Sequence, residues 1–108
     1  MDLSQYFICL LRKGPAWTTE ETPELEELQA RHLAHIRHLV EIGATIAAGP
    51  VSDESDIRGF SIFKTATLDE ARLLAEADPS VQSGFHIVEL HRWLTPSGAL
   101  PAPNTEPA

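Results

Sequence analysis

The chain has 108 residues, of which 43% are hydrophobic and 22% charged, and this composition is typical of one globular domain. Its formal net charge of -8 argues against anionic partners, so we expect neither nucleic acid nor a membrane surface among them. No apolar run approaches the ~20 residues of a membrane-spanning helix, and no secretory signal pattern is evident, which together predict a cytoplasmic protein. The single cysteine, Cys9, excludes an internal disulfide, and its apolar neighbours predict a core position.

The first elements expected are a short strand and a long helix. Residues 6–11 are consecutively apolar and rich in strand formers. After a connection that contains glycine, proline and an isolated tryptophan, Thr22 has the place of an N-cap and Pro23 that of the first helical residue. The helix is expected to run to about Ile42, where Gly43 stops it.

Two further strands follow, joined by a polar hairpin loop. Residues 44–48 are short and apolar, and we expect Gly49 and Pro50 to end this strand, because proline cannot donate to a strand ladder. Residues 57–65 form the third predicted strand, rich in aromatic and branched side chains.

The last part of the chain predicts a helix, a strand and a tail. Residues 67–70 have the form of a capping box and begin the helix, which ends at Asp78 and the proline after it. Residues 85–94 form the fourth strand. Residues 95–108 hold four of the eight prolines, so we expect a flexible tail outside a domain of residues 1–94.

The order strand, helix, strand, strand, helix, strand predicts an α+β fold. In a chain of this length it indicates a ferredoxin-like βαββαβ sandwich, with a four-stranded antiparallel sheet and both helices on one face. The first and third strands are apolar on both faces, whereas a sheet with one wet face alternates apolar and polar residues. The uncovered face therefore predicts a homodimer through the sheet faces, with either Phe7 and Leu11 or Tyr6 and Leu10 pointing outward.

Three histidines follow one another at intervals of three residues on the long helix. On a wheel of 100° per residue, His32 lies near the centre of the apolar stripe, His35 lies at its edge and His38 points away. His32 and His38 are about 120° apart around the helix, so the three cannot converge on one ion. A set of His32, His35 and Asp78 is conceivable, but no second cluster supports it, and we expect no metal and no other cofactor.

Several short motifs occur in an order and spacing that resemble one known family. They are His32-Leu33-Ala34, Gly43, Ala48-Gly49-Pro50, Arg58-Gly59, Glu70-Ala71, and Ala77-Asp78-Pro79 through Gly84. They resemble the YCII-related family over roughly residues 5–94. The resemblance implies a ferredoxin-like fold that dimerises face to face into an α/β barrel. It also implies a site on the family's histidine and the aspartate of its Asp-Pro motif, matched here by His32 and Asp78.

The same resemblance implies little about the reaction. Most members have no established activity, and one branch is similar to enzymes that remove chloride from chlorinated hydroxyhydroquinones. The chain departs from the family pattern in its extra histidines, its longer first connection and its proline-rich tail, so the substrate does not carry over.

His32 and Asp78 are also candidates on physical grounds. A histidine on the inner face of a helix needs a polar partner, and an aspartate at the end of the second helix would supply one. Such a pair fixes the tautomer of the ring and raises its basicity, as general acid–base chemistry requires. The alternative is structural: His32 is a satisfied core histidine, and Asp78 caps the turn before the following proline.

Arg58, Gly49 and Pro50 are the candidate substrate-binding residues. The guanidinium of Arg58 is a planar donor fork suited to a carboxylate or phenolate, although a surface arginine paired with an acidic residue is an equal alternative. Gly49 and Pro50 could open a loop over a pocket, or they could simply end the second strand.

Three functions remain open from the sequence. The first is a cofactor-independent enzyme that isomerises, eliminates from or hydrolyses a small aromatic or lactone substrate. The second is a non-catalytic dimeric module that binds a small ligand or a partner protein, and the third is a subunit whose barrel serves only assembly. A cavity beside His32 and Asp78 that solvent can reach distinguishes the first from a purely structural pair.

Overall fold

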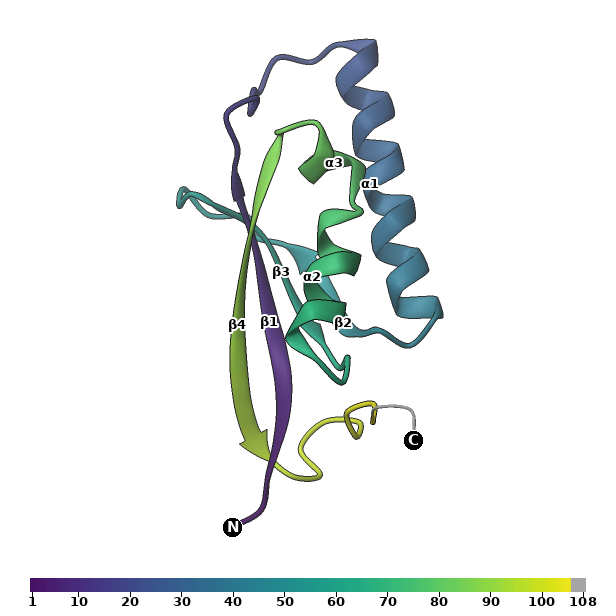
Figure 1. Ribbon diagram of the computed structural model, residues 1–108. Helices are drawn as coiled ribbons and strands as arrows, with labels where there is room; N and C mark the ends of the chain where they lie inside the picture. The colour runs from purple at the N-terminus through teal and green to yellow at the C-terminus, as the bar shows by residue number, and fades with distance from the viewer. Residues whose placement is uncertain (106–108) are drawn as a thin grey trace.

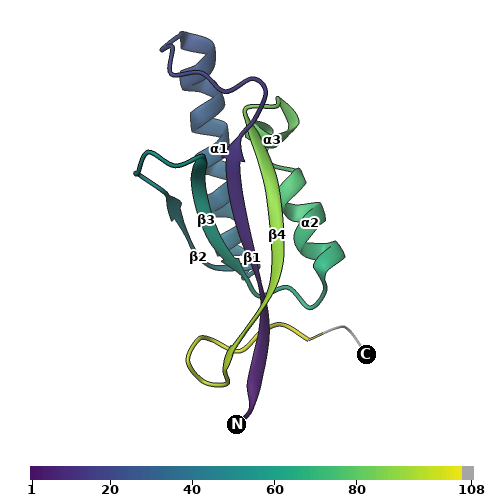
Figure 2. The same cartoon turned by 90° about the vertical axis from the view of Figure 1, so that its left-hand side faces the viewer.

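The computed structural model describes residues 1–105, and it confirms the predicted fold class (Figure 1). Its elements are β1 (Leu3–Lys13), α1 (Pro23–Glu41), β2 (Thr45–Pro50), β3 (Ile57–Phe63), α2 (Leu68–Glu76), α3 (Pro79–Gln82) and β4 (His86–Pro96). The four strands form one antiparallel sheet in the order β2-β3-β1-β4, as in a ferredoxin-like sandwich. The helices lie together on one face of this sheet (Figure 2). None of the helices within residues 1–105 is both long and apolar enough to cross a membrane.

The predicted caps set where the two main helices begin. The hydroxyl of Thr22 accepts the backbone N–H of Leu25 at 3.1 Å, with a proline at the first turn of α1. Thr67 does the same for Glu70 at 3.1 Å at the start of α2. Gly43 follows α1 with φ of 77°, a left-handed conformation that glycine adopts without strain. The ends of α1 therefore follow from its sequence.

The core lies between β1 and the helices. Phe7, Cys9 and Leu11 belong to one buried cluster, which they share with Phe63 and with side chains from α1 and α2. The alternate residues of β1, Tyr6 and Leu10 among them, therefore form the outward set. Cys9 is buried as predicted, and burial raises the pKa of its thiol to about 11, so it stays protonated and packs as an apolar group.

Several strand boundaries differ from the prediction. β1 and β4 pair along eleven residues, from Leu3 opposite Pro96 to Lys13 opposite His86, because backbone pairing continues where the apolar pattern stops. Pro50 is the last residue of β2, opposite Gly59, so the strand reaches two residues beyond the predicted end at residue 48. β2 is an edge strand, where a residue without an N–H is tolerated.

The chain after β4 folds back onto the sandwich (Figure 1). The hydroxyl of Tyr6 donates to the carbonyl oxygen of Pro101 at 2.9 Å. Asn104 donates its backbone N–H to the carbonyl oxygen of Lys64 at 2.8 Å and its side-chain amide to that of Gly43 at 3.2 Å. The first two residues of the predicted tail are thus the last two of β4, and these contacts join the following residues to the sandwich. Residues 106–108 of the tail lie outside the described part of the chain.

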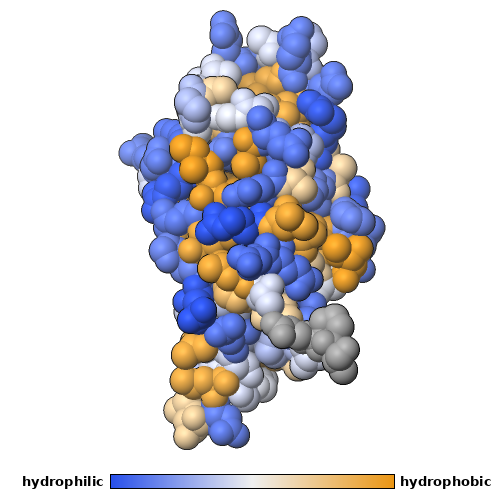
Figure 3. Space-filling model, in the orientation of Figure 1, coloured by the Kyte–Doolittle hydropathy of each residue, from blue (hydrophilic) through white to orange (hydrophobic). Residues whose placement is uncertain are grey.

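Apolar side chains also reach the surface, as the orange patches of Figure 3 show. On the face of the sheet away from the helices, Phe60 is 40% exposed and Ile87 is 50% exposed. They lie opposite Leu10 and Arg12 in the ladders with β1. The helices leave this side of the sheet uncovered.

Candidate active site

α1 carries His32 to the start of α3, where it meets Asp78. His32 Nδ1 and Asp78 Oδ2 are 2.6 Å apart, and the two side chains are 19% and 3% exposed. The inward position predicted for His32 from the helical wheel is therefore correct. An ionised carboxylate only accepts hydrogen bonds, so the proton between them lies on Nδ1, and the neutral form of this ring has its lone pair on Nε2.

Asp78 both contacts His32 and caps the following helix. It is the N-cap of α3, where its Oδ1 accepts the backbone N–H of Ser80 at 2.9 Å. Burial raises the pKa of Asp78, but hydrogen bonds from His32 and Ser80 and the charge of His32 lower it further than burial raises it. The net direction is down, so Asp78 remains an acceptor for both partners.

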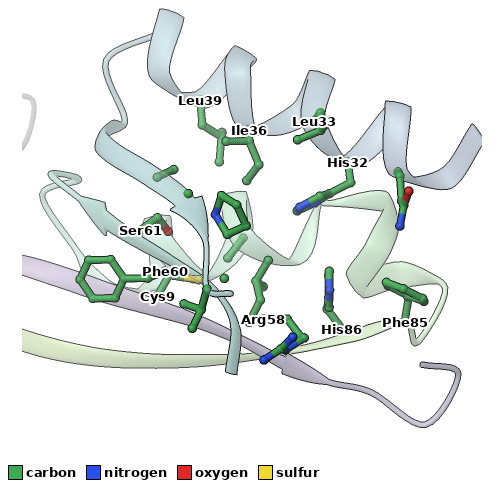
Figure 4. A pocket seen from close by; sticks show the side chains of 18 of the residues that line it. Cys9, His32, Leu33, Ile36, Leu39, Arg58, Phe60, Ser61, Phe85 and His86 are labelled. Carbon is green, nitrogen blue, oxygen red and sulfur yellow. The ribbon is translucent and has the colours of Figure 1, made fainter. Parts of the chain in front are cut away.

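A cavity of about 440 Å³ opens beside His32, between α1 and the sheet (Figure 4). Its wall includes the rings of Trp17, Phe63 and Phe85 and the aliphatic side chains of Ile36 and Leu39. His32 is part of the lining, whereas Asp78 stands behind it. This size and mainly apolar character suit a small organic ring compound.

A β-bulge brings Arg58 to the same cavity. The ladder between β1 and β3 skips one residue here, and bulges of this kind redirect a side chain. The Nη2 group of Arg58 donates to the carbonyl oxygens of Asp53 and Ser55, both at 2.7 Å, while its Nε is buried with no partner among the described residues. Gly49 and Pro50 form the cavity wall on β2. All three candidate binding residues thus border the space beside His32.

Sequence reasoning missed two members of the site, Ser80 and His86. Ser80 Oγ lies 2.9 Å from His86 Nδ1 and 3.3 Å from His32 Nδ1, and the two imidazole centroids are 5.3 Å apart. Burial lowers the pKa of His86 to about 4; the charges of His32 and Arg58 act in the same direction, and that of Asp78 opposes them. His86 is therefore neutral near pH 7.

One signal for His86 was present in the sequence. Val88 and Leu90 alternate with it along β4, and both pack against the core, which puts His86 on the helix-facing side. Ser80 carried no such signal, because nothing in its local pattern distinguishes it from other serines in turns.

A backbone contact holds Trp17 over one end of the cavity. The N–H of Gly14 donates to the carbonyl oxygen of Phe85 at 2.9 Å. A Cβ at Gly14 would lie 2.1 Å from the carbonyl oxygen of Gly84, so only glycine permits this approach. The Trp17 ring then packs on Phe85 at 4.7 Å and beside His86 at 5.9 Å between centroids.

The other two histidines of α1 play separate parts. His35 Nε2 donates to the carbonyl oxygen of Leu74 at 2.8 Å and so joins α1 to α2, while His38 is exposed. Within residues 1–105, no three histidine, cysteine, aspartate or glutamate side chains gather in a way that would hold a metal ion.

The sequence profile of the YCII-related domain matches residues 6–94. The chain belongs to the YCII-related family. Among solved structures, this YCII-related protein is similar to the 5-chloro-2-hydroxyhydroquinone dehydrochlorinase of Burkholderia phenoliruptrix AC1100 in complex with 2,5-dihydroxybenzoquinone. The TM-score is 0.55 at 22% sequence identity, over 82% of this chain and 92% of that one. Similarity at this identity supports the fold alone, and no curated protein matches the sequence.

Proposed function

We propose that this YCII-related protein is an enzyme that moves a proton on a small aromatic or lactone substrate, with His32 as general base and acid. The proposal rests on the 2.6 Å contact between His32 Nδ1 and Asp78 Oδ2 at the wall of the 440 Å³ cavity. A buried carboxylate in this position fixes the tautomer of the ring. It also stabilises the imidazolium that forms when the ring accepts a proton.

Nε2 of His32 is the atom that takes the proton. In an elimination, it removes a proton from the substrate while the leaving group departs with the electron pair of its bond to carbon. The imidazolium then releases the proton to water, which restores the free enzyme. In an isomerisation, the same proton returns to a different atom of the substrate, and in a hydrolysis it comes from the attacking water.

The cavity wall supports an oxygenated ring as the substrate class. Aromatic side chains favour the faces of a ring, and the unpartnered Nε of Arg58 favours a carboxylate, phenolate or carbonyl oxygen. Gly49 and Pro50 would bound the substrate on the side of β2. The structural relative acts on a chlorinated hydroxyhydroquinone and is seen with 2,5-dihydroxybenzoquinone, so these two compounds are the first to test.

We also propose a homodimer in which the outward sheet faces of two copies meet as an α/β barrel. Phe60 and Ile87 are exposed large apolar residues on that face, opposite Leu10 and Arg12 in the ladders. Monomers seldom leave contiguous apolar patches of more than a few hundred Å² in water, and a second copy would cover this one.

Ligand screening followed by turnover assays tests the proposed enzyme. Thermal shift with a panel of phenols, quinones and lactones, including 2,5-dihydroxybenzoquinone, identifies ligands by the stabilisation they cause. The panel is then assayed for conversion, with chloride release as the readout for 5-chloro-2-hydroxyhydroquinone. We expect at least one binding compound to be converted. Binding without conversion would favour the non-catalytic ligand-binding module instead, and stabilisation by none of them would contradict a small-molecule site.

A further inference from the structure

Asp78, His32, Ser80 and His86 form a continuous hydrogen-bonded chain along one end of the cavity. Asp78 accepts from His32 Nδ1 at 2.6 Å and from the Ser80 N–H at 2.9 Å. Ser80 Oγ then lies between the Nδ1 atoms of the two imidazoles, 3.3 Å from His32 and 2.9 Å from His86. Asp78, Ser80 and His86 are 2%, 1% and 7% exposed, so the positions of the protons are determined by these few groups.

The first half of the chain fixes the proton of His32. The Asp78 carboxylate has no proton to give, and its two oxygens accept from Ser80 N–H and from His32 Nδ1–H. Ser80 Oγ cannot donate to a nitrogen that already carries a proton directed at Asp78. Ser80 Oγ instead accepts a weak second hydrogen bond from His32 Nδ1–H, at 3.3 Å. The proton of the Ser80 hydroxyl therefore remains available to another acceptor.

The second half of the chain then fixes the proton of His86. Ser80 Oγ lies nearest to His86 Nδ1, at 2.9 Å, and this short contact favours donation by Ser80 to His86 over its side-chain contact with Asp78. A neutral imidazole has one N–H and one acceptor nitrogen. With Nδ1 accepting, the proton of His86 lies on Nε2. Burial lowers the pKa of His86 to about 4, so the ring carries this single proton at neutral pH.

We propose that His86 is a further catalytic residue, whose Nε2–H donates a hydrogen bond to an oxygen of the substrate while His32 Nε2 accepts a proton. Ser80 is the positioning residue that selects this tautomer. The two rings both line the cavity, with centroids 5.3 Å apart, and Figure 4 places them at the same end of it. One small ring compound can therefore touch both. This inference rests on the proposed role of His32.

The pairing of an acceptor with a donor narrows the substrate class. When His32 removes a proton next to a carbonyl or phenolic group, negative charge develops on that oxygen. A preorganised neutral imidazole donor stabilises this charge in a site shielded from water. The substrate should therefore be a cyclic compound with an oxygen near the proton that leaves, as in hydroxyquinones and lactones.

Arg58 and Trp17 support the same assignment. The guanidinium carbon of Arg58 lies 5.9 Å from the centroid of the Trp17 ring, and that ring lies 5.9 Å from His86. Trp17 therefore borders the same end of the cavity as Arg58 and His86. The positive charge of Arg58 favours an anionic oxygen and disfavours a second proton on His86.

Nitrogen-15 NMR of the imidazoles tests the tautomers without any substrate. At pH 7 we expect His86 to carry its proton on Nε2 and His32 to carry a proton on Nδ1. Ser80→Ala should turn His86 into a mixture of tautomers. Ser83→Ala is the matched control, because its hydroxyl donates to the backbone oxygen of Ser80 and touches neither ring. A wild-type His86 protonated on Nδ1, or on both nitrogens, would overturn the inference.

Calorimetric binding of 2,5-dihydroxybenzoquinone tests the contact with oxygen. Losing one hydrogen bond to a partly charged oxygen should weaken binding about tenfold in His86→Phe, while p-xylene, an apolar ring of similar shape, should bind both proteins alike. His86→Gln places an amide N–H near the position of Nε2 and should recover most of the affinity. Equal affinity of His86→Phe and wild type for the quinone, or no binding of the quinone by wild type, would overturn the inference.

The proposed function is judged by a different variant. In one outcome, His32→Ala retains full turnover while the NMR and binding results for His86 agree with the inference. The assignment of His32 as the general base would then be wrong, and His86 would remain a hydrogen-bond donor to the bound ligand. If His32→Ala lost turnover while His86→Phe bound and converted substrate as wild type does, the role of His86 would be wrong and the function of His32 would stand.

Discussion

Acidification should destabilise the protein through His86 before any carboxylate titrates. In the unfolded chain, His86 takes up a proton as the pH falls through about 6.5. In the folded protein, burial holds the pKa of this ring to about 4. The unfolded state therefore binds more protons between these values, and the free energy of unfolding falls as the pH falls through this window.

The magnitude follows from the difference between the two pKa values. A shift from 6.5 to about 4 at 1.36 kcal/mol per unit corresponds to an upper bound of about 3 kcal/mol, of which about 2 kcal/mol is lost by pH 5. The lowered pKa of Asp78 has the same sign, but it acts at lower pH, below the ordinary value for an aspartate. The loss between pH 7 and pH 5 therefore reports on His86.

Urea unfolding followed by circular dichroism at pH 7.5, 6 and 5 measures this loss. The protein concentration is kept fixed and high, since assembly adds to apparent stability. His86→Phe keeps an aromatic ring and removes the titrating group, so its stability should change less than that of wild type over this range. His91→Gln, on the same strand but 59% exposed, is the matched control and should follow wild type. Parallel losses in wild type and His86→Phe would refute the reasoning.

Three further predictions concern the fold and its assembly. Light scattering should report a dimer of the 11.9 kDa chain, and a wild-type monomer at micromolar concentration would contradict the barrel. Leu10→Glu, on the outward face, should dissociate or unfold the dimer. Leu73→Glu should not, because Leu73 is a residue of α2 that is 74% exposed. Tyr6→Phe loses the hydrogen bond to the returning tail and should cost about 1 kcal/mol in urea unfolding, whereas unchanged stability would mean that this contact is not formed in solution. Gly14→Ala forces a backbone clash and should lower the free energy of unfolding by about 1–3 kcal/mol. Gly49→Ala is the control and should be nearly neutral, because a Cβ at Gly49 meets no atom within 4 Å. Equal losses of stability in the two variants would refute the close approach at Gly14.

The sequence predicted the fold where local rules act alone. Thr22 and Gly43 mark the ends of α1 because caps and left-handed turns are properties of a few adjacent residues. The helical wheel placed His32 inward for the same reason. The predicted end of β2 came two residues early, because a proline can belong to a strand that lies at an edge, and local sequence does not determine which strand that is.

The rest of the site depends on contacts between distant segments. The partner of His32 came from the family resemblance, since Asp78 lies 46 residues away and nothing local joins them. The β-bulge that turns Arg58 into the cavity follows from the register of β3 against β1, which the sequence of β3 does not reveal. Ser80 contacts one histidine on α1 and another on β4, and these contacts form only once the elements are packed together.

The turnover of His32→Ala and Asp78→Asn, on the panel compound that wild type converts, tests the central claim most directly. His38→Ala, an exposed histidine on the same helix, is the matched control, and circular dichroism verifies that each variant folds. We expect His32→Ala to lower kcat by about 100-fold or more. Asp78→Asn should lower it less, since part of the imidazole population keeps the required tautomer, and His38→Ala should match wild type. Wild-type turnover in both His32→Ala and Asp78→Asn would contradict the catalytic role of this pair.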